Sequence, residues 1–158
     1  DQAISGGRFM WVRKYRSTVI ERSTNRVLDK LVAEHDGYRR LPGKPIHRRS
    51  WELDKLGDAL VVRDEISGNR AQPVSLNWHF SEECSVTCTP EGLLVANGPV
   101  NLEIILPPNG EVSLLRGSDT PLAGWVSRAY DRIVPSTTVT WRGRIEPGEE
   151  LETRIRRA

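Results

Sequence analysis

The sequence contains few of the side chains that hold metals or form cross-links. Among its 158 residues are two cysteines, three histidines and one methionine. The histidines, at positions 35, 47 and 79, form no His-x-His pair, and there is no second pair of cysteines to complete a zinc site. We therefore predict that the chain holds neither a metal nor another cofactor.

The two cysteines are expected to be free thiols. Cys84 and Cys88 flank a segment whose β-branched residues predict a strand. On a strand, four residues at about 3.3 Å each put the two Cα atoms roughly 13 Å apart, well beyond the ~7 Å limit for a disulfide. Their expected role is that of small buried apolar side chains.

The chain also has no long apolar run and no block of like charge. Nothing in it approaches the ~20 apolar residues of a membrane-spanning helix or the apolar core of a secretory signal. Its 23 Lys and Arg residues and 21 Asp and Glu residues are interspersed and give a net charge of +2. Such a balance argues against a dedicated nucleic-acid binder, so we expect neither nucleic acid nor a membrane as a partner.

The length suits one domain, which would bury roughly 68–70% of the surface that its unfolded chain exposes. No internal repeat or change of composition marks a boundary, so we predict a single domain over residues 1–158. The chain begins without a methionine, and we expect it to be an excised piece of a larger protein. Any targeting signal would then lie outside it.

Alternation of apolar and polar residues dominates the chain after residue 47 and predicts half-buried strands. Turn signals rich in Gly, Pro, Asn and Asp separate these segments. We therefore predict an all-β, largely antiparallel β-sandwich. The apolar residues that share one parity are Val74, Leu76, Trp78 and Phe80, then Val100, Leu102, Ile104 and Leu106, and finally Val139, Trp141 and Ile145.

One pair of charges follows from the spacing alone. If residues 55–58 form a hairpin loop, Asp54 pairs with Ala59 and the ladder sets Arg49 opposite Asp64. Both lie on the apolar parity of their strands, where a hydrogen-bonded ion pair is tolerable and a lone charge is costly. We expect a structural ion pair, with a catalytic role as the alternative. His47 falls on the same parity, either as a structural group or as a wall of a cleft.

Five short segments carry a resemblance to a known family: His35–Arg39, His47–Arg49, Val62–Gly68, Trp78–Phe80 and Gly124–Tyr130. Together they resemble the C-terminal β-domain of heparinase II/III-like proteins. The resemblance implies a parent protein that is a polysaccharide lyase, which cleaves uronate-containing polysaccharides such as glycosaminoglycans by β-elimination. Such proteins are often periplasmic or secreted, and in them a helical toroid and a β-sandwich enclose the substrate cleft.

The resemblance does not carry the family's catalytic residues onto this chain. The usual catalytic Tyr and His come from the toroid, and a further His and a His, Asp and His zinc site come from strands upstream of the matched region. None of these aligns with a residue here, so the chain alone is predicted to be inactive, with no catalytic residue. Its expected partners are the toroid and upstream strands of the parent and, through the parent, an acidic polysaccharide.

The first 45 residues fit two patterns. Val27, Leu28, Leu31, Val32 and His35 fit a helical stripe, whereas Leu31, Ala33 and His35 also fit one face of a strand. We predict a strand, which the resemblance favours. A second strand is predicted over Phe9–Ile20, a segment rich in aromatic and β-branched residues.

The turn that follows the predicted strand ending near His35 carries the candidate substrate-facing residues, His35, Tyr38, Arg39 and Arg40. Asp36-Gly37 predicts a tight turn that projects His35 and Tyr38 from one loop. β-Elimination needs a group that neutralises the uronate carboxylate, a base and an acid, and His, Tyr and Arg have suitable chemistry. The same basic stretch, which continues through Lys44 and His47–Arg49, would attract a polyanion if it lined a cleft. The alternative is a solvated turn whose Tyr packs against the sheet.

A second candidate site is aromatic. Trp125 and Tyr130 could stack on a sugar ring, or Trp125 could fill the core. Two alternatives to the lyase domain therefore remain: an autonomous carbohydrate-binding module, and a β-sandwich interaction domain that offers an apolar patch or a strand edge.

Overall fold

The computed structural model describes residues 2–7 and 10–158, and within these ranges it contains strands and no helix. Every strand pair whose register is known runs antiparallel. The prediction of an all-β, antiparallel fold is confirmed. No helix in the described part of the chain is long and apolar enough to cross a membrane.

The chain divides into two compact units. Unit 1 comprises the residues up to Gln72 together with Ile145–Arg154, and unit 2 comprises Pro73–Arg144 together with Ile155–Ala158. The expectation of one domain over residues 1–158 stays a prediction.

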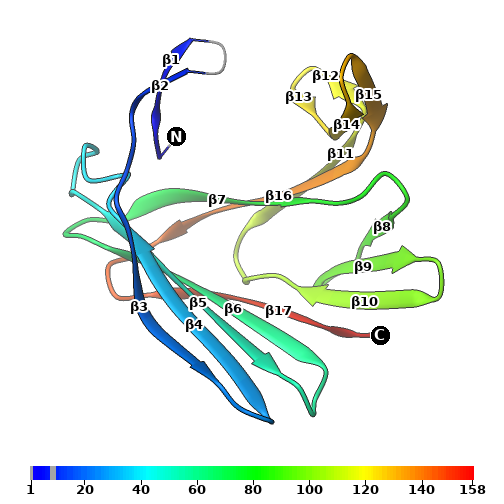
Figure 1. The fold of residues 1–158 in the computed structure, drawn as a ribbon, viewed down its shortest axis with the longest axis horizontal. Helices are drawn as coiled ribbons and strands as arrows, with labels where there is room; N and C mark the ends of the chain where they lie inside the picture. The colour runs from blue at the N-terminus through cyan, green and yellow to red at the C-terminus, as the bar shows by residue number, and fades with distance from the viewer. Residues whose placement is uncertain (1, 8–9) are drawn as a thin grey trace. The chain divides into compact units, whose positions relative to one another are not determined.

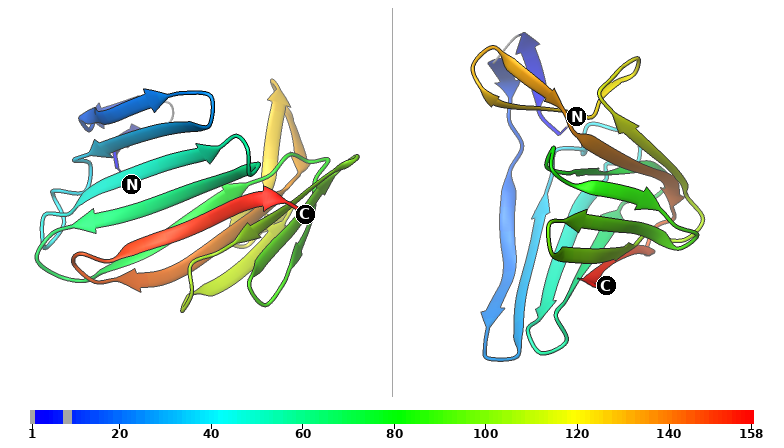
Figure 2. Two further views of the ribbon diagram at one scale, coloured as in Figure 1. Left: turned by 90° about the horizontal axis from the view of Figure 1, so that it is seen from below. Right: turned by 90° about the vertical axis from the view of Figure 1, so that its right-hand side faces the viewer.

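Unit 1 is built from hairpins that follow one another in sequence (Figure 1; Figure 2, left). A small hairpin comes first, and after it four strands lie side by side in chain order, with the first residues of β17 next to the last of them. The strands are β1 (Ile4–Gly7), β2 (Met10–Arg13), β3 (Ser17–Thr24), β4 (Leu28–His35), β5 (Ile46–Asp54), β6 (Ala59–Ser67) and β17 (Glu150–Arg157).

These bounds settle the two predictions for the first 45 residues. Leu28–His35 is a strand, so the helical pattern of this segment is overridden by pairing with β3 and β5. The single strand predicted over Phe9–Ile20 is wrong in its extent, because β2 ends at Arg13 and β3 begins at Ser17. Phe9 itself lies outside the described residues.

The β5–β6 hairpin has the predicted register. Asp54 pairs with Ala59, and Arg49 lies opposite Asp64. Within the loop, Oδ1 of Asp54 accepts hydrogen bonds from the backbone N–H groups of Leu56 and Gly57 at 3.0 and 2.9 Å. This short side-chain acceptor closes the turn and thereby sets the pairing of the whole ladder.

Unit 2 contains two sheets and two small hairpins (Figure 1). One sheet has the order β11-β16-β7, and the other places β8, β9 and β10 in a row beside the last residues of β17. The hairpins pair β12 with β13 and β14 with β15. The strands are β7 (Gln72–His79), β8 (Ser85–Cys88), β9 (Gly92–Asn97), β10 (Val100–Ile105), β11 (Glu111–Arg116), β12 (Ser118–Asp119), β13 (Leu122–Ala123), β14 (Trp125–Ala129), β15 (Arg132–Pro135) and β16 (Thr137–Ile145).

Trp141 is the largest fully buried side chain of this unit, with 1% of its surface exposed. Its indole Nε1 donates to the carbonyl oxygen of Pro107 at 2.8 Å. Gly110 and Gly143 lie against the ring, where an added Cβ would stand 2.0 and 2.2 Å from indole atoms. The two glycines therefore provide the space that the indole fills.

The predicted apolar parity matches the observed core in part, because Val100 at the start of β10 is exposed. Leu76, Ile104, Leu106 and Val139 are buried, as is Leu93 of β9. Cys84 and Cys88 are free, as predicted. The expectation that they are buried is wrong, because Cys88 is exposed and Cys84 is only partly covered.

Candidate functional site

A chain of polar side chains crosses three neighbouring strands of unit 1. The register sets His35, the last residue of β4, opposite His47 of β5, and sets Arg49 of β5 opposite Asp64 of β6. His35 Nε2 and His47 Nδ1 are 3.0 Å apart, and His47 Nε2 lies 2.5 Å from Oδ1 of Asp64. We call these four residues the histidine chain.

Asp64 is the buried end of the histidine chain, with 2% of its surface exposed. Arg49 binds both oxygens of its carboxylate, Nε to Oδ1 at 2.7 Å and Nη2 to Oδ2 at 3.0 Å. Burial by itself raises the pKa of Asp64, but the hydrogen bonds from His47 and Arg49 outweigh it, so that this pKa lies below its usual value. The carboxyl group is therefore ionised at neutral pH.

The ionised carboxylate determines where the protons of the two imidazoles lie. Because a carboxylate only accepts hydrogen bonds, Nε2 of His47 carries a hydrogen. Gly37 N–H donates to Nδ1 of His35 at 3.3 Å, so the hydrogen of a neutral His35 lies on Nε2, where it is donated to Nδ1 of His47. All four ring nitrogens are thus engaged.

His35 stays neutral at pH 7. Burial lowers its pKa, and the nearby His47 and Arg49 lower it further, while Asp36 acts in the opposite direction. A neutral ring agrees with the proton positions set by Asp64.

Two tyrosine rings flank His35. The ring centroids of Tyr15 and Tyr38 lie 5.2 and 5.3 Å from that of the imidazole, both tilted. Tyr15 is 42% exposed. Tyr38 was among the predicted site residues and Tyr15 was not. Because Ser17 pairs with His35 in the β3–β4 hairpin, residue 15 lies just beyond the end of this ladder, close to His35.

The 36–40 turn is tied to the segment before β3. Arg16 N donates to Oδ1 of Asp36 at 2.8 Å, and Asp36 N donates to the carbonyl of Arg16 at 3.1 Å. Arg39 N donates to the Asp36 carbonyl at 3.0 Å, and the Arg40 guanidinium donates to that of Gly37. Arg39 and Arg40 are exposed. The structure therefore brings the four predicted substrate-facing residues to one corner of unit 1, which also holds Tyr15 and Arg16.

The corner combines aromatic faces with positive charge. Arg16, Arg39 and Arg40 carry guanidinium groups at this corner, together with the carboxylate of Asp36. Such a surface suits a ligand that has apolar ring faces and acidic substituents. Among the described residues, no group of three or more His, Cys, Asp or Glu side chains could hold a metal ion.

The structure does not bring Trp125 and Tyr130 together. Trp125 pairs with Pro135 at the base of the β14–β15 hairpin, where its Nε1 donates to the carbonyl of Ser118 at 3.0 Å. Tyr130 lies at the tip of that hairpin and is fully exposed. Only Tyr130 presents an open aromatic face.

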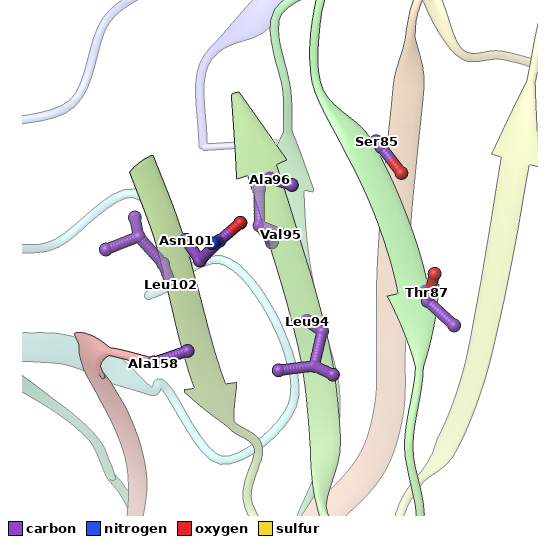
Figure 3. A pocket seen from close by; sticks show the side chains of 8 residues that line it. All are labelled: Ser85, Thr87, Leu94, Val95, Ala96, Asn101, Leu102 and Ala158. Atoms are coloured by element: carbon purple, nitrogen blue, oxygen red, sulfur yellow. The ribbon is translucent and has the colours of Figure 1, made fainter. Parts of the chain in front are cut away.

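Unit 2 also has a shallow hollow of about 310 Å³ on the β8–β10 sheet (Figure 3). None of its lining side chains is ionisable or aromatic, so it has neither the charge nor the stacking surface expected for an acidic sugar. The lining residues are Ser85, Thr87, Leu94, Val95, Ala96, Asn101, Leu102 and Ala158.

The sequence as a whole decides the family. Residues 1–156 match the model of the family described as heparinase II/III-like, C-terminal. The chain belongs to this family. The motif-based resemblance is thereby confirmed for the heparinase II/III-like domain, although no curated protein is similar enough in sequence to match it.

Solved structures support the fold of the heparinase II/III-like domain. It is similar to a heparinase III (TM-score 0.71, 16% identity) and to a heparan sulfate lyase HepC from Pedobacter heparinus (TM-score 0.68, 17% identity). In both comparisons 92% of this chain is covered, and it spans 22% of the other chain. A second heparinase III structure matches with a TM-score of 0.60 and 18% identity. The domain therefore corresponds to about a fifth of these enzymes.

Proposed function

We propose that this heparinase II/III-like domain is the non-catalytic β-portion of a polysaccharide lyase that cleaves uronate-containing polysaccharides by β-elimination. It supports the catalytic region and lines part of the substrate cleft with the corner around His35. The observation that carries the proposal is the match of residues 1–156 to the family, since heparinase III and a heparan sulfate lyase share the fold.

The hydrogen bonding of the histidine chain supports a non-catalytic role. A general base needs a lone pair within reach of the substrate proton. The acceptor nitrogens of His35 and His47 are both occupied, one by Gly37 N–H and the other by the His35 ring. In this arrangement the imidazoles position the turn, and a base for the reaction would come from elsewhere in the parent protein.

The exposed face of the first three strands supports a role beside upstream strands of the parent. β3 is the outermost strand of its sheet, and all eight of its residues are exposed. An exposed strand edge of this kind is a liability unless another element covers it. The large apolar side chains exposed on β1, β2 and β3 are Ile4, Met10, Trp11, Val12, Val19 and Ile20.

Activity measurements on the parent protein and on the 158-residue chain test the proposal. Both would be incubated with heparan sulfate, hyaluronan, chondroitin and alginate while the absorbance of unsaturated uronate is followed. We expect activity in the parent alone. Activity in the isolated chain would overturn the non-catalytic assignment and direct attention to His35 and Tyr38.

Substitutions in the parent test the cleft-lining part. Tyr38→Ala and Arg39→Ala should raise KM several-fold and leave kcat within about twofold, because they remove binding that the ground and transition states share. Arg132→Ala, an exposed arginine of unit 2, is the matched control. Unchanged KM in both corner variants would show that the corner does not face the substrate.

An autonomous carbohydrate-binding module is the second candidate, favoured by the fully exposed ring of Tyr130. It requires that the isolated chain bind an acidic polysaccharide and that Tyr130→Ala or Tyr38→Ala abolish this binding. Retained binding in both variants would count against it.

A further inference from the structure

The His35–His47 pair has a defined place for each of its protons. Four ring nitrogens share two hydrogens in the neutral pair. One hydrogen, on His47 Nε2, points to the Asp64 carboxylate, and the other lies between the rings. The remaining nitrogen, Nδ1 of His35, accepts the N–H of Gly37.

A third proton has only one nitrogen left to occupy. The bond to Asp64 keeps a hydrogen on His47 Nε2, and the bond between the rings holds one hydrogen whichever ring donates it. The additional hydrogen therefore lies on His35 Nδ1, whether the positive charge resides on His35 or on His47. There it faces the N–H of Gly37, and two donors cannot bond to each other.

We propose that the histidine chain is an acid-sensitive latch, in which uptake of one proton by the His35–His47 pair expels Gly37 N–H from His35 and removes one of the hydrogen bonds that hold the 36–40 turn. The latch takes up one proton and not two, because a fourth hydrogen would set two N–H groups against each other between the rings. Asp64 stays ionised throughout and keeps His47 in place.

The charged and titratable groups around the pair set the direction of the response. Arg49 approaches from β5 and Asp64 from β6, Tyr15 from the segment before β3, and Asp36 and Tyr38 from the turn itself. Arg49 disfavours the added charge and Asp36 favours it. Burial also lowers the pKa of His35. Because opening takes up a proton, the latch is closed at higher pH and opens on acidification.

The turn that loses this hydrogen bond carries Tyr38, Arg39 and Arg40. Acidification would therefore alter how these side chains are presented to a ligand. Only this last step rests on the proposed function, and the latch itself is a property of the chain without substrate.

Nuclear magnetic resonance on the 158-residue chain tests the latch directly. At pH 7.5, ¹⁵N shifts of the imidazoles should show hydrogen on Nε2 and a lone pair on Nδ1 in both His35 and His47. On titration to pH 5, the Gly37 amide should shift with the His35 ring. Its protection from exchange, corrected for the intrinsic pH dependence, should fall roughly threefold to tenfold, as expected for the loss of one hydrogen bond. The proposal would be overturned if His35 carried its hydrogen on Nδ1 at pH 7.5. It would also be overturned if the chemical shift of the Gly37 amide did not change between pH 7.5 and pH 5.

A matched pair of variants separates the latch from a general effect of acid. In His35→Asn the side-chain oxygen can accept the Gly37 N–H and does not titrate, so the pH response of Gly37 should disappear. His79→Asn removes an exposed histidine of unit 2 and should leave that response intact. A response that persists in His35→Asn would refute the latch. Because no substrate is involved, neither result bears on the lyase proposal.

Discussion

Arg49 and Asp64 face each other across the β5–β6 ladder, and the guanidinium binds both oxygens of a carboxylate that is 2% exposed. Removal of Asp64 leaves Arg49 and His47 without their acceptor. We expect Asp64→Ala to lower the free energy of unfolding by about 3–5 kcal/mol, the usual cost of breaking a buried pair from one side. Denaturant unfolding measures the change.

The control for this variant is Arg48→Ala, on the same strand. Arg48 pairs with Glu34 and Glu65, and its side chain is 47% exposed. Solvent screens such a pair, so the expected loss is below about 1 kcal/mol. If Asp64→Ala and Arg48→Ala lowered the free energy of unfolding by similar amounts, the burial of Asp64 would not explain the cost of removing it.

The stability of the chain should decline on mild acidification through His35. Its folded pKa lies below the unfolded value, so the unfolded state binds more protons and stability falls as the pH drops below about 6.5. The free energy of unfolding, measured between pH 7.5 and 5, should decrease more in the wild type than in His35→Asn. Parallel curves for the two proteins would show that His35 contributes nothing to this dependence.

Trp141 is expected to dominate the stability of unit 2. Trp141→Ala removes a fully buried ring and the hydrogen bond to Pro107, and should cost about 3–5 kcal/mol. Tyr130→Ala, which truncates a fully exposed ring, should change stability by no more than about 0.5 kcal/mol. Thermal and denaturant unfolding of both variants provide the comparison, and a large loss for Tyr130→Ala would mean that the tip of its hairpin is covered in solution.

Glu82 and Arg128 form a surface pair with a measurable electrostatic signature. The hydrogen bonds from Arg128 lower the pKa of Glu82 to about 2, with Nη2 at 2.9 Å from Oε2. Arg128→Ala should return this pKa toward 4.5, the ordinary value, in a carboxyl titration followed by nuclear magnetic resonance. Any stabilisation from the pair is present above the ordinary value and is lost as the pH falls toward 2.

Arg116→Ala is the matched control for the Glu82 titration. Arg116 contacts the same residue, but its Nη2 donates to the backbone carbonyl of Glu82 and not to the carboxylate. The pKa of Glu82 should therefore stay low in this variant. If the pKa of Glu82 rose equally in Arg128→Ala and Arg116→Ala, its low value would be caused by the general positive charge of the surface and not by the hydrogen bonds from Arg128.

The two thiols should react at different rates in the native protein. Cys88 is exposed and Cys84 is partly covered, and the rate at which a reagent modifies a thiol depends on access to it. A thiol reagent such as DTNB should modify Cys88 first and Cys84 more slowly, and unfolding should make the rates equal. A mass two hydrogens lower under air would reveal a disulfide and contradict the free thiols.

Part of the site follows from residue type and spacing alone. The loop of residues 55–58 and the period of two set Arg49 against Asp64, because a hairpin joins strands that are adjacent in sequence and a short loop allows one register. The Asp36-Gly37 turn is likewise predictable from its residues.

The rest of the site required the pairing of segments that sequence alone does not join. His35 contacts His47 because β4 lies beside β5 after the 36–45 connection, and Tyr15 reaches His35 because β3 lies on the other side of β4. The alternation of apolar and polar residues within each strand does not show which strand lies beside it.

Residue type and spacing along single segments were enough to predict the all-β class, the free cysteines and the β5–β6 register. The family required several segments taken together. Tertiary structure decided the proton positions in the histidine chain, the separation of Trp125 from Tyr130 and the break between β2 and β3. These depend on which strands lie side by side, and that choice is made by burial and hydrogen bonding summed over distant parts of the chain.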